Sequence, residues 1–196
     1  MWQWYHATRA AFPDNKPLLL INMDETSICS FQGFVYGNVV VPDKGEQRPQ
    51  QDYDLSRRRT CLTHACFICN VHRLQHKMPQ LIIMNEHLCN AQVFKEIARK
   101  APAGIYVKRC KSAWMNEEMM CILIRVLYEH LKEEWPHYHV VLMLDAYKAH
   151  FHWNVMMECN RKKIVLIIIP ATLTWLLQPC DTHVFAGYKK YMRRLW

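Results

Sequence analysis

Three short apolar runs constrain the fold of this chain most strongly. They cover residues 17–24, 139–144 and 164–169, and the first two lead directly to an acid, Asp24 and Asp145. Runs of this length with few polar positions are typical of central strands that are buried on both faces of a sheet. Neighbouring strands lie about 4.8 Å apart, so acids at matched depths on adjacent strands can share divalent cations. The runs therefore predict a sheet that carries a carboxylate site.

The remaining elements surround these strands. Further strands are expected over residues 33–42, 60–71, 78–84 and 104–107, with a polar loop over 43–59 and helices over 88–101, 116–135, 151–160 and 181–195. The clearest helix begins after Asn116, a favoured N-cap, carries Glu117 and Glu118 in its first turn, and stops before Pro136. A strand meander followed by alternating strands and helices predicts an α/β fold with a mixed sheet flanked by helices.

Composition sets the broad class of protein. The 196 residues carry a net charge of +8 with 51% hydrophobic residues, which is typical of a basic globular domain and excludes a disordered chain or a coiled coil. No apolar run approaches the roughly 18 residues of a membrane helix, and the first residues lack the features of a signal peptide, so we expect an intracellular protein. The nine cysteines follow no repeating framework and are interpreted as reduced thiols.

Three acidic motifs occur in order along the chain. Asp24 lies in Asp-Glu-Thr after a hydrophobic run, Asp145 follows another and precedes His150 by five residues, and Asp181 ends a Leu-Gln-Pro-Cys-Asp segment, with 35 residues between it and Asp145. Together they resemble the DDE superfamily endonuclease domain of pogo and mariner type transposases. Met78-Pro79-Gln80-Leu81-Ile82-Ile83 and Trp114-Met115-Asn116-Glu117 match as well, so the resemblance runs from about Leu18 to Tyr191.

The resemblance implies an RNase H-like catalytic domain over residues 17–196, with residues 1–16 a remnant of an upstream linker or helix. It also implies that Asp24, Asp145 and Asp181 are both the catalytic and the metal-binding residues. They would hold two Mg²⁺ or Mn²⁺ ions, with Asp24 as the bridging ligand. The expected activity is cleavage of DNA by hydrolysis and joining by transesterification, with DNA as the partner, no membrane, and the nucleus as the location; a homodimer stays open.

The chain also departs from the family pattern. Ala146 follows the second acid where the family often has Asn, and Cys180 precedes the third where the family has Leu. The helix-turn-helix region that relatives carry upstream is missing, so we expect a catalytic domain alone or the product of a domesticated element. The alternative function is a catalytically silent module of the same fold that binds nucleic acid.

Two further residues lie beside the acids. His150 is a candidate accessory residue that orients a carboxylate or contacts DNA, although a histidine after a strand is more often structural. Glu25 points away from Asp24 if the strand continues, so we expect a structural role for it. Asp181 is expected to cap the helix that follows it as well as to bind metal.

A cysteine and histidine cluster raises the hypothesis of structural zinc. Its members are Cys61, His64, Cys66, Cys69, His72 and His76. Only two residues separate the Cys pair from the His pair, whereas a zinc finger leaves about 12, and on a strand Cys66 and Cys69 face opposite sides. Zinc therefore stays a minor alternative.

Three basic groups are candidate DNA contacts. They are Arg57, Arg58 and Arg59; Arg161, Lys162 and Lys163; and Lys189, Lys190, Arg193 and Arg194. Basic residues near a helix C-terminus often only complement the helix dipole, but the net positive charge favours a nucleic-acid partner for the set.

Overall fold

A single mixed sheet organises the molecule. The computed structural model describes residues 9–12, 14–28, 62–87 and 89–195. Its strands are β1 (Leu18–Ile28), β2 (Leu62–Cys69), β3 (Gln80–Asn85), β4 (Ile105–Cys110), β5 (His139–Asp145) and β6 (Ile164–Ile169), in the order β4-β3-β2-β1-β5-β6. β1, β2 and β3 form an antiparallel meander, whereas β4, β5 and β6 each run parallel to a neighbour. The predicted α/β mixed sheet is confirmed; the strand predicted over 33–42 and the loop over 43–59 lie outside the described residues.

Helices connect and cover the strands. They are α2 (Ala91–Lys100), α3 (Glu117–Leu131), α4 (Trp153–Arg161), α5 (Thr174–Leu177) and α6 (Ala186–Leu195), with short turns η2 (His72–Lys77), η3 (Trp135–His137), η4 (Lys148–Phe151) and η5 (Ala171–Leu173) and one π-helical turn η6 (Cys180–Phe185). The predicted cap of α3 is confirmed, because the Asn116 side chain accepts a hydrogen bond from the Met119 amide at 2.9 Å. None of the helices described is both long and apolar enough to cross a membrane.

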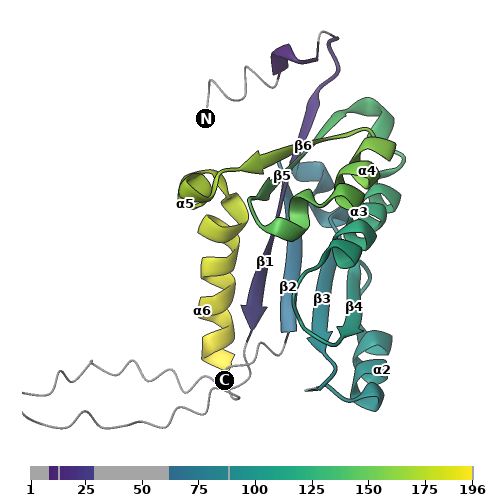
Figure 1. The fold of residues 1–196 in the computed structure, drawn as a ribbon, viewed down its shortest axis with the longest axis vertical. Helices are drawn as coiled ribbons and strands as arrows, with labels where there is room; N and C mark the ends of the chain where they lie inside the picture. Colours follow the sequence, from purple (N-terminus) through teal and green to yellow (C-terminus); the bar gives the residue numbers. More distant parts are fainter. Residues whose placement is uncertain (1–8, 13, 29–61, 88, 196) are drawn as a thin grey trace, which may run out of the picture.

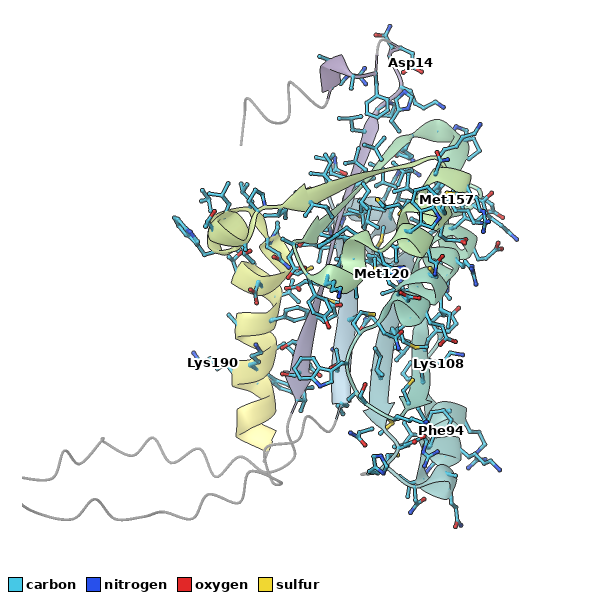
Figure 2. The ribbon with its side chains drawn as sticks, in the orientation of Figure 1. Asp14, Phe94, Lys108, Met120, Met157 and Lys190 are labelled. Atoms are coloured by element: carbon cyan, nitrogen blue, oxygen red, sulfur yellow. The ribbon has the colours of Figure 1, made fainter. Side chains whose placement is uncertain are left out.

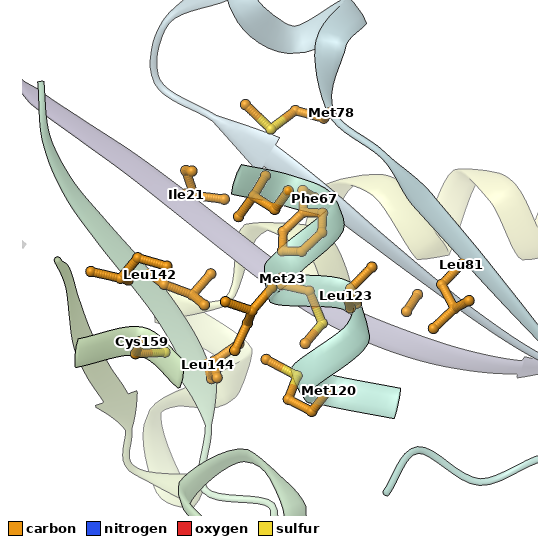
Figure 3. Packing of buried hydrophobic residues seen from close by; sticks show 14 of the residues in the cluster. Ile21, Met23, Phe67, Met78, Leu81, Met120, Leu123, Leu142, Leu144 and Cys159 are labelled. Atoms are coloured by element: carbon orange, nitrogen blue, oxygen red, sulfur yellow. The ribbon is translucent and has the colours of Figure 1, made fainter. Parts of the chain in front are cut away.

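The two faces of the sheet have different covers. α3 and α4 lie on one face, and η6 and α6 lie along β1 on the other (Figure 1). The main core fills the first interface, where Met120 and Leu123 of α3 meet Met23, Phe67 and Leu142 of three central strands (Figure 3). A smaller cluster of Cys66, Cys180 and Phe185 anchors η6 to the second face.

β1 extends further than its apolar run suggests. The predicted end at Asp24 is wrong, because β1 continues to Ile28 and pairs there with Leu62 of β2. Asp24 itself stands opposite Cys66 within the ladder. The backbone hydrogen bonds of the ladder persist although the side chains become polar, since strand pairing uses main-chain groups. Asp24 therefore projects from the middle of a rigid strand and not from a loop.

Candidate functional site

Alternate residues of β1 form a buried polar row. Asn22, Asp24 and Thr26 are 4%, 6% and 3% exposed. Successive side chains of a strand point to opposite faces, so these three share the face that η6 and α6 cover, while Met23 points into the main core. A polar row on a central strand is costly to bury unless it serves a structural or chemical purpose.

The parallel pairing of β1 with β5 brings two of the predicted acids together. The last registered pair is Asn22 with Met143, so Asp24 and Asp145 each lie two residues further along neighbouring strands and on the same face. Asp145 is the last residue of β5, and its side chain is 29% exposed. The matched depths that the apolar runs predicted are therefore present.

Asn22 brings the third acid to the same region. Its amide group donates to the Met143 carbonyl at 3.1 Å, and its Oδ1 accepts from the backbone amide of Cys180 at 3.0 Å. The Cys180 thiol is buried and contacts the Asn22 carbonyl at 3.6 Å. This contact fastens the start of η6 to β1, and Asp181 is the next residue.

Asp181 does not cap a helix as predicted. It lies inside the first turn of η6, and no side chain caps that turn. Pro179 occupies the N-cap position and η6 begins at Cys180, so Asp181 lies one residue inside the helix, past the position from which a side chain caps it. The exposed side chain of Asp181 is therefore not used to cap the helix.

The electrostatics of Asp24 link the three acids. The pKa of Asp24 is raised to about 7, chiefly by burial; a hydrogen bond from the Glu25 amide opposes the change, and the negative charges of Glu25, Asp181 and Asp145 add to it. A carboxylate that is buried among like charges resists ionisation. A divalent cation would remove this penalty, because it offsets the accumulated negative charge.

His150 bridges Asp145 and Glu25. Its Nδ1 lies 2.6 Å from Asp145 Oδ1, and its Nε2 lies 2.9 Å from Glu25 Oε1. Burial alone would lower the pKa of His150, but the bonds to the two carboxylates raise that pKa to about 10. Conversely, burial works to raise the pKa of Asp145, and His150 together with the Tyr147 amide brings that pKa below its usual value. The ring therefore lies between two carboxylates, which favour its protonated form.

The three carboxylates are chemically suited to bind a hard divalent cation. Carboxylate oxygens are the ligands that Mg²⁺ and Mn²⁺ prefer, and three of them leave positions for water and phosphate. Among the described residues, no three His, Cys, Asp or Glu side chains already converge in the arrangement that would hold an ion. Asp24 and Asp145 are thus neighbours in strand register, and the charge of Asp181 acts on Asp24, although within the described structure the three carboxylates do not meet at one point.

The structure separates the predicted basic groups. Lys189 and Lys190 are exposed on α6, the helix that continues from η6, and Lys190 is labelled in Figure 2. Lys163 precedes Ile164, which pairs with Val140 at the start of β5, so Lys163 lies about 20 Å along the strands from the level of Asp145.

Two members of that distant group already have partners. Arg161 pairs with Glu158 at 3.7 Å, and the Lys162 ammonium lies 3.9 Å from the centre of the Tyr128 ring. Arg57, Arg58 and Arg59, and the side chains of Arg193 and Arg194, lie outside the described part of the chain.

The zinc alternative gains no support from the described members of the cluster. Cys66 packs against the η6 side of the sheet, Cys69 packs against the main core on the other side, and the His64 Nε2 hydrogen-bonds with Gln80 at 2.8 Å. His72 and His76 are exposed on η2, and Cys61 lies outside the described residues. Cys66, Cys69, Cys89, Cys110, Cys121, Cys159 and Cys180 are free thiols, as predicted.

Sequence reasoning missed the contacts of three residues beside the acids. Asn22 fastens η6, Glu25 holds His150, and Gln178 is buried with neither polar atom of its side chain hydrogen-bonded within the described structure. The alternation of polar residues at positions 22, 24 and 26 was a readable signal for Asn22. Glu25 and Gln178 carried no such signal, because their neighbours come from distant segments.

Comparisons with known proteins identify the family. A family model described as DDE superfamily endonuclease matches residues 62–196, which is more than half of the chain. Two solved structures are similar, a Mos1 transposase paired-end complex with left transposon end and a Mos1 mariner paired end complex with Mn. Each has 13% identity and a TM-score of 0.51, and they cover 97% and 95% of this chain.

The structural matches and the family model support different conclusions. This chain spans 45% of each Mos1 chain, and at 13% identity the likeness concerns the fold alone. No curated protein matches the sequence significantly. The fold is therefore the RNase H-like fold that Mos1 transposase shares, and the family model shows that the chain belongs to the DDE superfamily endonucleases.

Proposed function

We propose that this chain is the metal-dependent DNA cleavage and strand-transfer domain of a DDE transposase, or of a protein derived from one. The observation that carries the proposal is the pairing of β1 with β5, which sets Asp24 and Asp145 at matched depths on one face. The influence of Asp181 on the pKa of Asp24 supports a common site for all three acids.

The proposed roles follow from the position of each acid. Asp24, which stands centrally on β1, would serve both ions, and Asp145 and Asp181 would each hold one of them. Two bound Mg²⁺ or Mn²⁺ ions would activate the attacking water or 3′-hydroxyl and stabilise the leaving oxygen. β1 and β5 hold their acids rigidly, whereas the exposed Asp181 on η6 has more freedom to move towards an ion.

DNA is the proposed substrate. Lys189 and Lys190 are exposed on α6, directly after the element that carries Asp181, and the net charge of the chain is +8. Phosphate contacts of this kind give affinity with little sequence preference. We place Lys163 and its neighbours outside this surface, since they lie at the other end of β5 and β6. A homodimer and a nuclear location stay predictions.

A catalytically silent module is the second candidate function. The specific observation in its favour is that the described acids do not converge in a metal-holding arrangement. The same fold and basic surface would then bind DNA without cutting it. The two candidates differ in whether metal binding at the acids leads to strand cleavage.

Nicking of supercoiled DNA decides between them. We expect the wild-type chain with Mn²⁺ to nick slowly and leave 3′-hydroxyl ends, and a chelator to abolish the activity. Mn²⁺ is used because Mg²⁺ demands stricter octahedral geometry. Asp145→Ala should remove nicking and keep salt-dependent DNA binding.

Asp14→Asn is the matched control. Asp14 also pairs with a histidine, His139, but at the opposite end of β5. This variant should nick as fast as wild type. If wild type binds Mn²⁺ and DNA but nicks no faster than Asp145→Ala, the enzyme proposal fails and the silent module replaces it.

A further inference from the structure

We infer that Glu25 is a positioning residue that acts through His150 to fix which oxygen of Asp145 faces the metal site. The inference rests on the proposed function, in which Asp145 is a metal ligand. Glu25 comes from β1, His150 from η4 and Asp145 from β5. The contacts of these three side chains therefore connect β1, η4 and β5.

The contacts of Asp145 are concentrated on one oxygen. Oδ1 lies 2.6 Å from His150 Nδ1 and accepts a hydrogen bond from the Tyr147 amide at 3.0 Å. Within the described part of the chain, both polar contacts of this carboxylate are made by Oδ1. Oδ2 is consequently the oxygen that remains for an ion, so Asp145 binds through a single oxygen.

Glu25 determines whether His150 can hold that geometry. An imidazole that is bonded through one nitrogen can still tilt about that bond, and the 2.9 Å bond from Nε2 to Glu25 fixes the second nitrogen. The His150 side chain is fully buried, and the Glu25 side chain is 13% exposed. Little water can reach this pair to replace the carboxylate, so loss of Glu25 leaves a buried N–H without its partner.

Glu25 itself is not a ligand. It is adjacent to Asp24 on an extended strand, and the two side chains therefore project from opposite faces. η4 turns around the end of β5 and brings His150 to the Glu25 side, while the ring still reaches Asp145. The arrangement ties the acid of β5 to the strand that carries the first acid, and so sets their mutual position.

Mn²⁺ binding to the full chain, followed by the electron paramagnetic resonance of free Mn²⁺, tests the inference. Glu25→Ala should weaken Mn²⁺ binding about 10- to 100-fold, the usual effect of removing a residue that supports a ligand. Glu129→Ala is the control, because its side chain is 60% exposed on α3 and should leave Mn²⁺ affinity unchanged.

Two conservative variants separate the effect of side-chain length from the effect of negative charge. They test the inference even if Glu25→Ala does not fold. Glu25→Gln keeps an oxygen within reach of Nε2 without the charge, and Glu25→Asp keeps the charge but is one methylene shorter. Positioning predicts that Glu25→Gln binds Mn²⁺ more tightly than Glu25→Asp. The reverse order would show that only the negative charge matters, and would overturn the inference.

Asp145→Asn distinguishes this inference from the proposed function. If Asp145→Asn weakens Mn²⁺ binding and folded Glu25→Ala stays within twofold of wild type, the positioning role is wrong and the metal site stands. If Asp145→Asn binds Mn²⁺ as wild type does, the proposed metal site fails, and the role of Glu25 fails with it.

Discussion

Replacing Asp24 with asparagine should stabilise the metal-free protein at neutral and alkaline pH. The Asp24 carboxylate is only 6% exposed, and burial together with Glu25, Asp181 and Asp145 raises its pKa from 3.8 to about 7. The folded state therefore binds this proton more tightly than the unfolded state. Stability from Asp24 is largest at low pH and is lost as the pH rises from about 4 to about 7.

The size of the effect follows from the same pKa. Between pH 5 and the pKa of about 7 lie about two pH units, and each unit lowers the free energy of unfolding by about 1.4 kcal/mol. Wild type should therefore lose about 3 kcal/mol of stability from Asp24. Asp24→Asn carries no titrating carboxyl there and avoids that loss. The free energy of unfolding of the variant, relative to wild type, should thus rise by about 3 kcal/mol between pH 5 and pH 8.

Urea unfolding at pH 5 and pH 8, in the presence of a chelator, measures the difference in the free energy of unfolding between Asp24→Asn and wild type. Subtracting wild type from Asp24→Asn removes the contributions of the other titrating groups that the two proteins share. Mn²⁺ at pH 8 should remove most of this advantage of the variant, because an ion bound 100-fold above its Kd adds about 2.7 kcal/mol to wild type and little to the variant. Equal pH dependence of the two proteins would refute the reasoning that Asp24 is ionised at a cost.

Three other perturbations test the surrounding structure. Asn22→Ala leaves a buried amide of η6 and a carbonyl of β5 unpaired, and should cost about 1–3 kcal/mol for each in urea unfolding. Leu123→Ala empties a fully buried core position and should cost about 2–5 kcal/mol in the same assay. Lys189→Ala and Lys190→Ala should each make the salt dependence of DNA affinity shallower by about one unit of slope, whereas Lys163→Ala should leave the slope unchanged.

Local sequence patterns predicted most of the regular elements. β6 has the predicted bounds of 164–169, because six consecutive apolar residues that end at Pro170 leave little choice of element. The start of α3 after Asn116 also follows from local chemistry, since a capping side chain bonds within its own turn. The end of β1 was wrong, because main-chain pairing with β2 continues where the apolar side chains stop.

The sequence by itself determined the order of the three acids and the α/β class, because hydrophobic periodicity and motif spacing are properties of short segments. Only the tertiary structure decided what surrounds those acids. Glu25 meets His150 across 125 residues, and Asn22 holds Cys180 across 158. Lys163 lies between Asp145 and Asp181 in the sequence, but in the structure it precedes the first residue of β6, at the opposite end of the strands from Asp145. Such contacts depend on strand register and on the path of η4 and η6, and these are set by the packing of the whole sheet, which no single segment encodes.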